Sequence, residues 1–327
     1  MATFVDDNGL NGAGLVVVDR DAGIVHEEYV GEFTRDRVSL IASASKMIAA
    51  GVLLRLADDG LLDLDAPVAD VVEWGSANPA VTPAQLVSNS SGLGGLFSPL
   101  TSTVYGCQFE FAGEIESCGA EVFTTAADDA EVIAPDTEYR YGGVQWQVAG
   151  AVAEAVGGTT WAELIDEIYV DPCGVDSLGF TNQWAAAGGF GYPADFDPET
   201  LTPTDNPSIE GGAYITPPDY AELLLMHLRN GECADGRVLS GEAIERAHTD
   251  HVATSYPDGG AGHPGYGFGW WIDRDTGILT DPGAYGAVPW LDLADGYGAF
   301  LVLEADATAG LQLYAQLAPV VDGILAG

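Results

Sequence analysis

Lysine is almost absent from this chain of 327 residues. Lys46 is the only one, and the other nine of its ten basic residues are arginines. Against them stand 50 acidic residues, which gives a net charge of -40. Because binding to nucleic-acid phosphates or to anionic lipids needs clustered Lys and Arg, the composition excludes nucleic-acid and membrane-surface partners.

Other features are missing as well. No apolar run reaches the roughly 18 residues that a membrane-spanning helix needs. The start, MATFVDDNGL, lacks the basic and apolar parts of a signal peptide, so export would require a leader outside this sequence. The chain has no G-x-S-x-G elbow, which weakens the case for a Ser-His-Asp hydrolase. It also has no Cys/His zinc spacing, and we expect neither a metal nor a cofactor.

The acidic excess has two explanations, which the sequence leaves open. One is adaptation to a salt-rich environment, where counter-ions screen the repulsion between carboxylates. The other is an acidic secreted protein from a marine or similar source. Both predict that the fold weakens at low salt.

Four cysteines indicate disulfides and an oxidising compartment, and hence a secreted or extracytoplasmic protein. Cys107 and Cys118 bracket a segment that resembles a short polar loop, whereas Cys173 and Cys233 lie near turn signals. Of the three possible pairings, we favour Cys107 with Cys118 and Cys173 with Cys233. Four free thiols are the alternative, since a chain of this size can form a core that is stable without disulfides.

Strand patterns gather at both ends of the chain, and helical patterns fill the middle. Residues 13–33 predict a β-hairpin, and several strands follow residue 265. We expect an α+β fold in which one antiparallel sheet is built from both chain termini and flanked by helices. Residues 1–60 and 216–327 would form this sheet domain and 61–215 a mostly helical inserted domain, with the active-site cleft between them.

Helical periodicity predicts further elements. They include a helix within 39–60, a helix opened by Thr82 and Pro83, helices within 144–157 and 159–170, a capped helix over 216–231, another over 240–250 and a C-terminal helix that Pro319 would break or kink.

The sole lysine stands in the pattern Ser43-Ala-Ser-Lys46. Residues three apart on a helix share a face, so the hydroxyl and the amine can touch. Ser43 would lie at the helix N-terminus, where backbone N–H groups favour a developing oxyanion. A serine nucleophile and its proton acceptor would thus come from one helical turn. The alternative is a capping serine beside a lysine that reaches solvent, but a cation early in a helix is disfavoured by the dipole.

The sequence resembles the serine β-lactamase and penicillin-binding-protein superfamily, in particular its class C-like branch with the family VIII carboxylesterases. The likeness covers most of the chain. The segments that carry it are IASASKMIAAGVLLRLADDGLLDLDAPV, TPAQLVSNSSGLGG, YRYGGVQWQVAGAVAEAVGG, GGAYITPPDYAELLLMHLRNG and YGFGWWID. The resemblance implies that Ser43 is the acylated nucleophile, Lys46 its partner and Tyr141 the general base or proton relay. It also implies an oxyanion hole made by the backbone N–H groups of Ser43 and of Ala284, on the strand of the third family motif.

The chain departs from the family pattern at three places. Gly143 replaces the asparagine of the family's Tyr-x-Asn, with Gln145 nearby, and Asn89 stands where a histidine is common. The third motif, usually Lys-Thr-Gly or His-x-Gly, would be Asp281-Pro282-Gly283, although this tripeptide is also a plain turn signal. On this alignment Gly143, Gln145, Asp281 and Gly283 would contact substrate.

An acidic residue where relatives offer a cation would repel a substrate carboxylate. We therefore expect a carboxylesterase for neutral small acyl esters that works through an acyl-enzyme on Ser43. An amidase, peptidase or β-lactamase with the same machinery is the alternative, and a non-catalytic ligand-binding relative is the alternative of another class. Because the negative field raises a lysine pKa, we expect an alkaline optimum.

Overall fold

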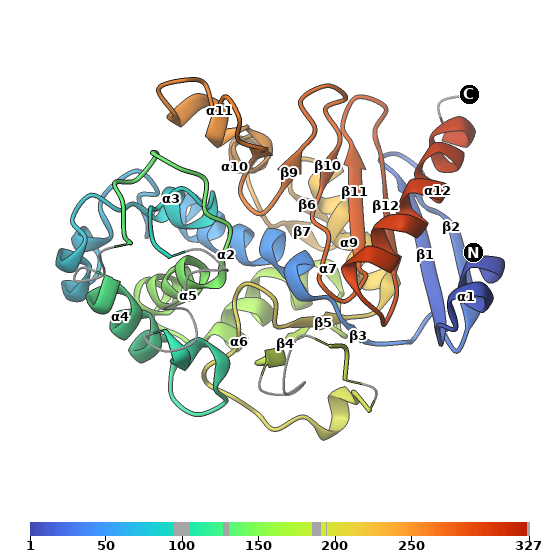
Figure 1. Cartoon of the computed structure of the whole chain (residues 1–327), viewed down its shortest axis with the longest axis horizontal. Helices are drawn as coiled ribbons and strands as arrows, with labels where there is room; N and C mark the ends of the chain where they lie inside the picture. The colour runs from blue at the N-terminus through green and yellow to red at the C-terminus, as the bar shows by residue number, and fades with distance from the viewer. Residues whose placement is uncertain (95–104, 127–130, 185–190, 194, 326–327) are drawn as a thin grey trace.

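The computed structural model describes residues 1–94, 105–126, 131–184, 191–193 and 195–325. A seven-stranded antiparallel sheet forms one side of the molecule (Figure 1), with strand order β2-β1-β12-β11-β10-β9-β8. Its strands are β1 (Gly12–Asp19), β2 (Gly23–Gly31), β8 (Gly265–Tyr266), β9 (Trp271–Ile272), β10 (Leu279–Thr280), β11 (Val288–Asp292) and β12 (Tyr297–Val302). The first hairpin pairs with the last strand, so the expected sheet from both termini is confirmed.

The sheet separates two apolar layers because the strand β1 is apolar on both faces. Val16 and Val18 join the main core, while Leu15 and Val17 pack in a second cluster with the C-terminal helix. Alternate side chains of a strand point to opposite faces, and this alternation produces the division. On the main-core face, the Tyr220 ring stacks on Phe300 at 4.0 Å between centroids. Helix α9 (Pro217–Leu228) thus covers one face and α12 (Ala307–Leu325) the other.

Most of the other helices gather at one side of the sheet, whereas α1 lies at the opposite end beside β1 and β2 (Figure 1). Among them, α2 (Lys46–Asp58) and α5 (Gly143–Gly157) are buried along most of their length and pack together. The remaining helices are α1 (Ala2–Asn8), α3 (Pro83–Val87), α4 (Ile115–Ala126), α6 (Trp161–Ile165), α7 (Asp171–Cys173), α10 (Gly241–His248) and α11 (His251–Ser255). A π-helical turn, Asp166–Val170, joins α6 to α7. Two small sheets complete the fold, β3 (Ser39–Leu40), β5 (Ala213–Ile215) and β4 (Gly179–Phe180) in that order, and β6 (Glu232–Cys233) with β7 (Gly236–Arg237).

Helix starts follow the capping signals in the sequence. The Thr82 side chain accepts a hydrogen bond from the Gln85 N–H, and the Gln85 side chain closes a capping box ahead of α3. Thr216 caps α9 in the same way through the Asp219 N–H. Each cap satisfies an N–H that the first helical turn leaves without a partner. At the other end of the chain, α12 continues through Pro319 and is not ended by it.

Both disulfides that we favoured are present, Cys107–Cys118 and Cys173–Cys233. The expectation that 107–118 is only a polar loop is wrong, because α4 begins at Ile115 and includes Cys118. Two of the helix's inward-facing residues, Val122 and Phe123, are fully buried. The polar segment before α4 hid the helical pattern, which starts late and has few charges.

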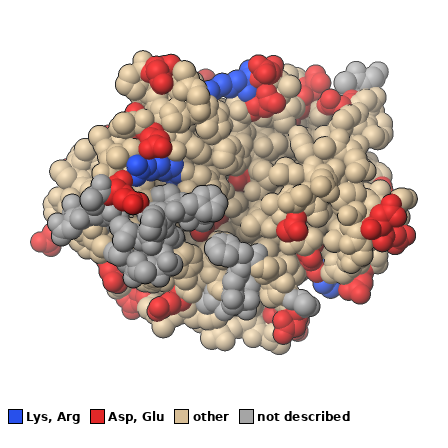
Figure 2. Space-filling model, in the orientation of Figure 1, with Lys and Arg blue, Asp and Glu red and all other residues tan. Residues whose placement is uncertain are grey.

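No helix in the described part of the chain has the length and apolar content to cross a membrane. Carboxylates are spread over the face shown in Figure 2, with few basic side chains between them. The basic side chains are also all engaged. Seven arginines pair with carboxylates, namely residues 35, 37, 55, 140, 237, 246 and 274, and Arg20 and Arg229 donate to backbone carbonyls. Most surface carboxylates therefore have no basic partner in the chain.

We expect the melting temperature to rise as NaCl increases from about 0.05 M to about 1 M, because the Debye length falls from more than 10 Å to about 3 Å. The measurement is thermal unfolding followed by circular dichroism at pH 7. An equal concentration of sucrose at low salt controls for general osmolyte effects. A melting temperature that stays flat or falls with salt would contradict this account of the charge.

Candidate active site

Ser43 lies in a tight turn between strand β3 and helix α2. The turn, Ala42–Ser45, is a 3-10 helix that runs directly into α2. Ala42 holds a left-handed backbone with φ of 46°, a conformation that costs a non-glycine residue about 1–3 kcal/mol. The Ser45 hydroxyl donates to the Ala42 carbonyl at 2.6 Å and accepts from the Ala213 N–H at 3.0 Å, which ties the turn to β5. Ser43 stays partly exposed while residues on both sides of it are buried.

Lys46 is the first residue of α2, and its side chain is fully buried. Its Nζ donates to Ser43 Oγ at 3.2 Å, so the pair suggested by the spacing is in contact. The ammonium also donates to the Glu210 carbonyl at 2.8 Å and lies 3.4 Å from Glu210 Oε2. The polar end of Lys46 is thus fixed between the hydroxyl and Glu210.

Tyr141 completes the group that the sequence analysis expected. Its ring centroid lies 4.6 Å from Lys46 Nζ, and its phenol interacts with the Ser43 hydroxyl. Tyr266 and Trp271 support the ring at centroid distances of 6.4 and 5.3 Å. The structure therefore brings Ser43, Lys46 and Tyr141 together; Ser43 and Tyr141 are partly exposed and Lys46 is fully buried.

Burial and charge act against each other on these groups. Burial lowers the pKa of Lys46, but the surrounding Tyr141, Glu210 and Asp281 outweigh it and raise the pKa above the ordinary lysine value. Burial also raises the pKa of the Tyr141 phenol, and the nearby lysine only partly opposes this. Both groups therefore hold their protons at neutral pH, and proton transfer from Ser43 becomes easier as the pH rises.

Glu210 is the site residue that the sequence analysis missed. Its carboxyl lies next to Gly143: a Cβ built on Gly143 would be 2.3 Å from Glu210 Oε1 and 2.6 Å from Gln108 Oε1. Gly143 therefore does not contact substrate through a side chain; its lack of one leaves room for the carboxylate. The only sequence signal was the missing asparagine at 143, because Glu210 is 164 residues from Lys46 along the chain.

Gln145, expected near substrate, is fully buried and its amide is occupied by protein groups. Its oxygen accepts from the Ser91 hydroxyl, and its nitrogen donates to Asn89 Oδ1 and to the Arg140 carbonyl, each at 2.7 Å. Asn89, with φ of 56°, also accepts from the Trp146 indole at 3.0 Å. These residues hold the segment before Tyr141 against the turn at 88–91, so the structure gives Gln145 a scaffolding position and not a ligand position.

The segment Asp281-Pro282-Gly283 lies beside the Ser43 turn, but Asp281 is fully buried and does not face the cleft as expected. Its Oδ2 accepts from the Met47 N–H at 3.4 Å, at the start of α2. Burial raises the pKa of this carboxyl well above its usual range. Pro282 follows the end of β10, so its missing N–H costs no ladder bond.

Gly283 packs directly against the turn that carries Ser43: a Cβ there would lie 2.0 Å from the Ile41 carbonyl oxygen. Ala284, the next residue, is partly exposed. In the described part of the chain the backbone N–H groups of Ser43 and Ala284 have no protein acceptor. Two N–H groups without a protein acceptor thus lie on adjoining segments of the site.

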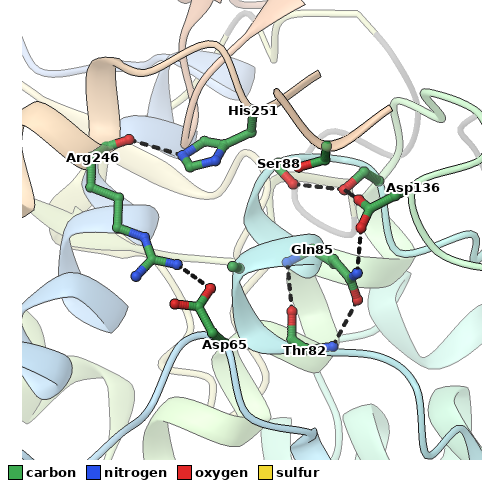
Figure 3. Close-up of a pocket in the computed structure, with 10 residues that line it drawn as sticks. Asp65, Thr82, Gln85, Ser88, Asp136, Arg246 and His251 are labelled. Carbon is green, nitrogen blue, oxygen red and sulfur yellow. Dashed lines mark hydrogen bonds and ion pairs between the residues drawn. The ribbon is translucent and has the colours of Figure 1, made fainter. Parts of the chain in front are cut away.

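A separate polar cavity of ≈ 190 Å³ lies near the turn at 88–91 (Figure 3). In the view, the Gln85 amide donates to Asp136, and Arg246 pairs with Asp65. Its described lining includes none of Ser43, Lys46 or Tyr141. Nor do the described residues include three or more His, Cys, Asp or Glu side chains grouped to hold a metal.

Comparisons with known proteins show the family and the fold. The family model described as beta-lactamase matches residues 1–318. Penicillin-binding protein 4 of Amycolatopsis lactamdurans is 26% identical, over 97% of this chain and 86% of that protein. Esterase EstB of Burkholderia gladioli is 26% identical, over 84% and 75%. Among solved structures, simvastatin synthase from Aspergillus terreus shares the fold with a TM-score of 0.72 at 18% identity, covering 99% of this chain and 97% of that one.

Gly283→Ala should disrupt the turn that carries Ser43, because the new Cβ would meet a backbone oxygen that cannot move aside. We expect a loss of about 1–3 kcal/mol in the free energy of unfolding, the usual cost of overpacking. The matched control is Gly323→Ala, in α12, where a Cβ meets nothing within 4 Å. Urea unfolding measures both. Equal stability of the two variants would show that Gly283 is not packed on Ile41.

Proposed function

Because the chain belongs to the beta-lactamase family, we propose that it is a serine hydrolase that forms an acyl-enzyme on Ser43 and acts as a carboxylesterase on neutral small acyl esters. The observation that carries the proposal is the 3.2 Å contact between Ser43 Oγ and the buried Lys46 Nζ. Nucleophile and proton acceptor within hydrogen-bonding distance are the requirement of this chemistry.

In the proposed reaction, Ser43 Oγ attacks the carbonyl carbon of the ester as its proton passes to the Lys46–Tyr141 pair. The N–H groups of Ser43 and Ala284 hold the oxyanion that forms. When the carbon–oxygen bond to the leaving group breaks, the same pair returns the proton to the alcohol. Water then attacks the acyl-enzyme by the reverse sequence, and the acid and free Ser43 are released.

The charges around the site favour a neutral substrate. No cation stands at the third-motif position, where Asp281 is buried away from the cleft, and the only lysine is buried in the machinery. Every arginine is engaged elsewhere, in ion pairs or with backbone carbonyls. A substrate carboxylate, as in a β-lactam, would thus meet no free cation among the described residues. The esterase among the relatives is in line with this choice.

We also propose that the site lies where two parts of the chain meet. Ser43, Lys46 and Asp281 come from the proposed sheet domain, residues 1–60 and 216–327. Tyr141 and Glu210 come from the proposed helical domain, residues 61–215. Substrate would enter between these two parts, at the side where Ser43 and Tyr141 are partly exposed.

A fluorophosphonate should label the protein once, on Ser43, as peptide mass mapping would show. The wild type should hydrolyse p-nitrophenyl butyrate, and Lys46→Ala should lower kcat/KM by about 10²–10⁴-fold, as expected for loss of a general base. Nitrocefin should be a much poorer substrate than the ester.

Three outcomes would contradict the proposal. No label on Ser43 in the folded protein would favour a non-catalytic ligand-binding relative. Full turnover by Lys46→Ala would exclude the Ser-Lys mechanism. Preference for nitrocefin over the ester would favour β-lactam or amide hydrolysis by the same residues.

The pH dependence should be alkaline. Activity needs a deprotonated acceptor for the Ser43 proton, and the pKa values of both Lys46 and Tyr141 are raised. We therefore expect kcat/KM for p-nitrophenyl butyrate to keep rising above pH 7, measured with the protein's stability checked at each pH. An optimum below pH 6 would be inconsistent with these groups as proton acceptors.

A further inference from the structure

Three acceptors surround the Lys46 ammonium. They are Ser43 Oγ at 3.2 Å, the Glu210 carbonyl at 2.8 Å and Glu210 Oε2 at 3.4 Å. An ammonium has three protons to donate, so this set matches it fully. Two of the three acceptors belong to one residue, which therefore determines where the amine points.

Glu210 is itself deeply buried, with 5% of its surface exposed. A buried carboxylate is costly unless a cation pairs with it, and Lys46 is the cation in contact. The other charged or titratable groups that face Lys46 are Tyr141 and Asp281. Burial raises the pKa of both, which disfavours their anionic forms. Among the described residues, Glu210 is the group whose carboxyl is joined to Lys46 by an ion pair, at 3.4 Å.

Position 143 explains how the carboxylate fits. The space that a side chain at 143 would fill is occupied by the Glu210 carboxyl, 2.3 Å from the position of the missing Cβ. Glu210 Oε1, the oxygen at that position, has no hydrogen-bond partner among the described residues. Gly143 and Glu210 are therefore complementary: the carboxylate is accommodated only while position 143 has no side chain.

We propose that Glu210 is the positioning residue of the site: through its backbone carbonyl and its carboxylate it orients Lys46 toward Ser43. The inference rests on the proposed serine hydrolase for its catalytic meaning. The contact and charge argument concerns the folded protein alone, so it can be tested without turnover.

The first test uses the fact that Lys46 is the only lysine. Protein grown with ¹³Cε-lysine gives one lysine signal in an NMR spectrum, and its shift with pH reports the pKa of Lys46. Glu210→Gln keeps the shape and removes the charge, so we expect this pKa to fall by about 1–3 units, the usual effect of an opposite charge in contact. The matched control is Glu232→Gln, an exposed carboxylate that pairs with Arg237, which should leave the signal unchanged. Equal titration of wild type and Glu210→Gln would overturn the proposal.

The second test is a double-mutant cycle between positions 143 and 210. Gly143→Asn alone should lower the melting temperature and slow fluorophosphonate labelling, because the new side chain collides with the carboxylate. In a Glu210→Ala background the same change should cost less stability, because the carboxylate no longer collides with the new side chain. It should also restore labelling several-fold relative to Glu210→Ala, by returning an acceptor for Lys46. Gln108 faces the Cβ in both backgrounds, so its contribution cancels. Additive effects of the two changes would overturn the proposal.

Failure of the proposed hydrolase and failure of the positioning role of Glu210 give different results. If Ser43 of the wild type does not react but the Lys46 signal shifts in Glu210→Gln, the positioning role stands and the proposed hydrolase fails. If Ser43 reacts but its labelling rate has the same pH profile in wild type and Glu210→Gln, the hydrolase stands and the positioning role fails.

Discussion

The burial of one ammonium group beside a serine hydroxyl is the constraint on which the site depends. An amine without solvent around it must have its hydrogen bonds supplied by the protein, and here a hydroxyl, a carbonyl and a carboxylate supply them. The electrostatic cost of that burial explains why neighbouring groups are arranged so closely. Glu210 contacts the ammonium, the Tyr141 ring lies over it, and Asp281 accepts a hydrogen bond from the start of the helix that carries it. Reactivity at Ser43 is thus linked to a network whose members lie far apart in sequence.

The fold serves this network by fixing three chain segments against one helix start. The Ser43 turn is tied to β5 through Ser45, the 281–283 segment packs on Ile41, and the segment before α5 is held by Gln145 and Asn89. Each of these contacts is made by backbone or by buried polar groups, which leave little freedom to move. The left-handed conformation at Ala42 persists because these surroundings determine it.

Patterns within a few neighbouring residues predicted the features that depend only on those residues. The spacing of Ser43 and Lys46 implies contact on one helical turn, and the capping signals at Thr82 and Thr216 give the helix starts. Sequence could not show Glu210, because its partner is distant along the chain and the only trace was a side chain missing at 143. The sequence correctly predicted that Asp281 lies near the Ser43 turn, but not that its side chain is buried. Burial depends on packing between segments that are distant in sequence. Helix α4 was missed because its start carries polar residues and a cysteine.

The engagement of the sole lysine has a practical consequence for handling the molecule. Reagents that target ε-amines, such as succinimidyl esters and glutaraldehyde, find no accessible lysine on this chain, because Lys46 is fully buried. Attachment to a solid support or a dye is better directed to the abundant surface carboxylates through carbodiimide coupling. Conversely, modification of the ε-amine would report that the crevice around Lys46 had opened, which makes reactivity at Lys46 a direct measure of its integrity.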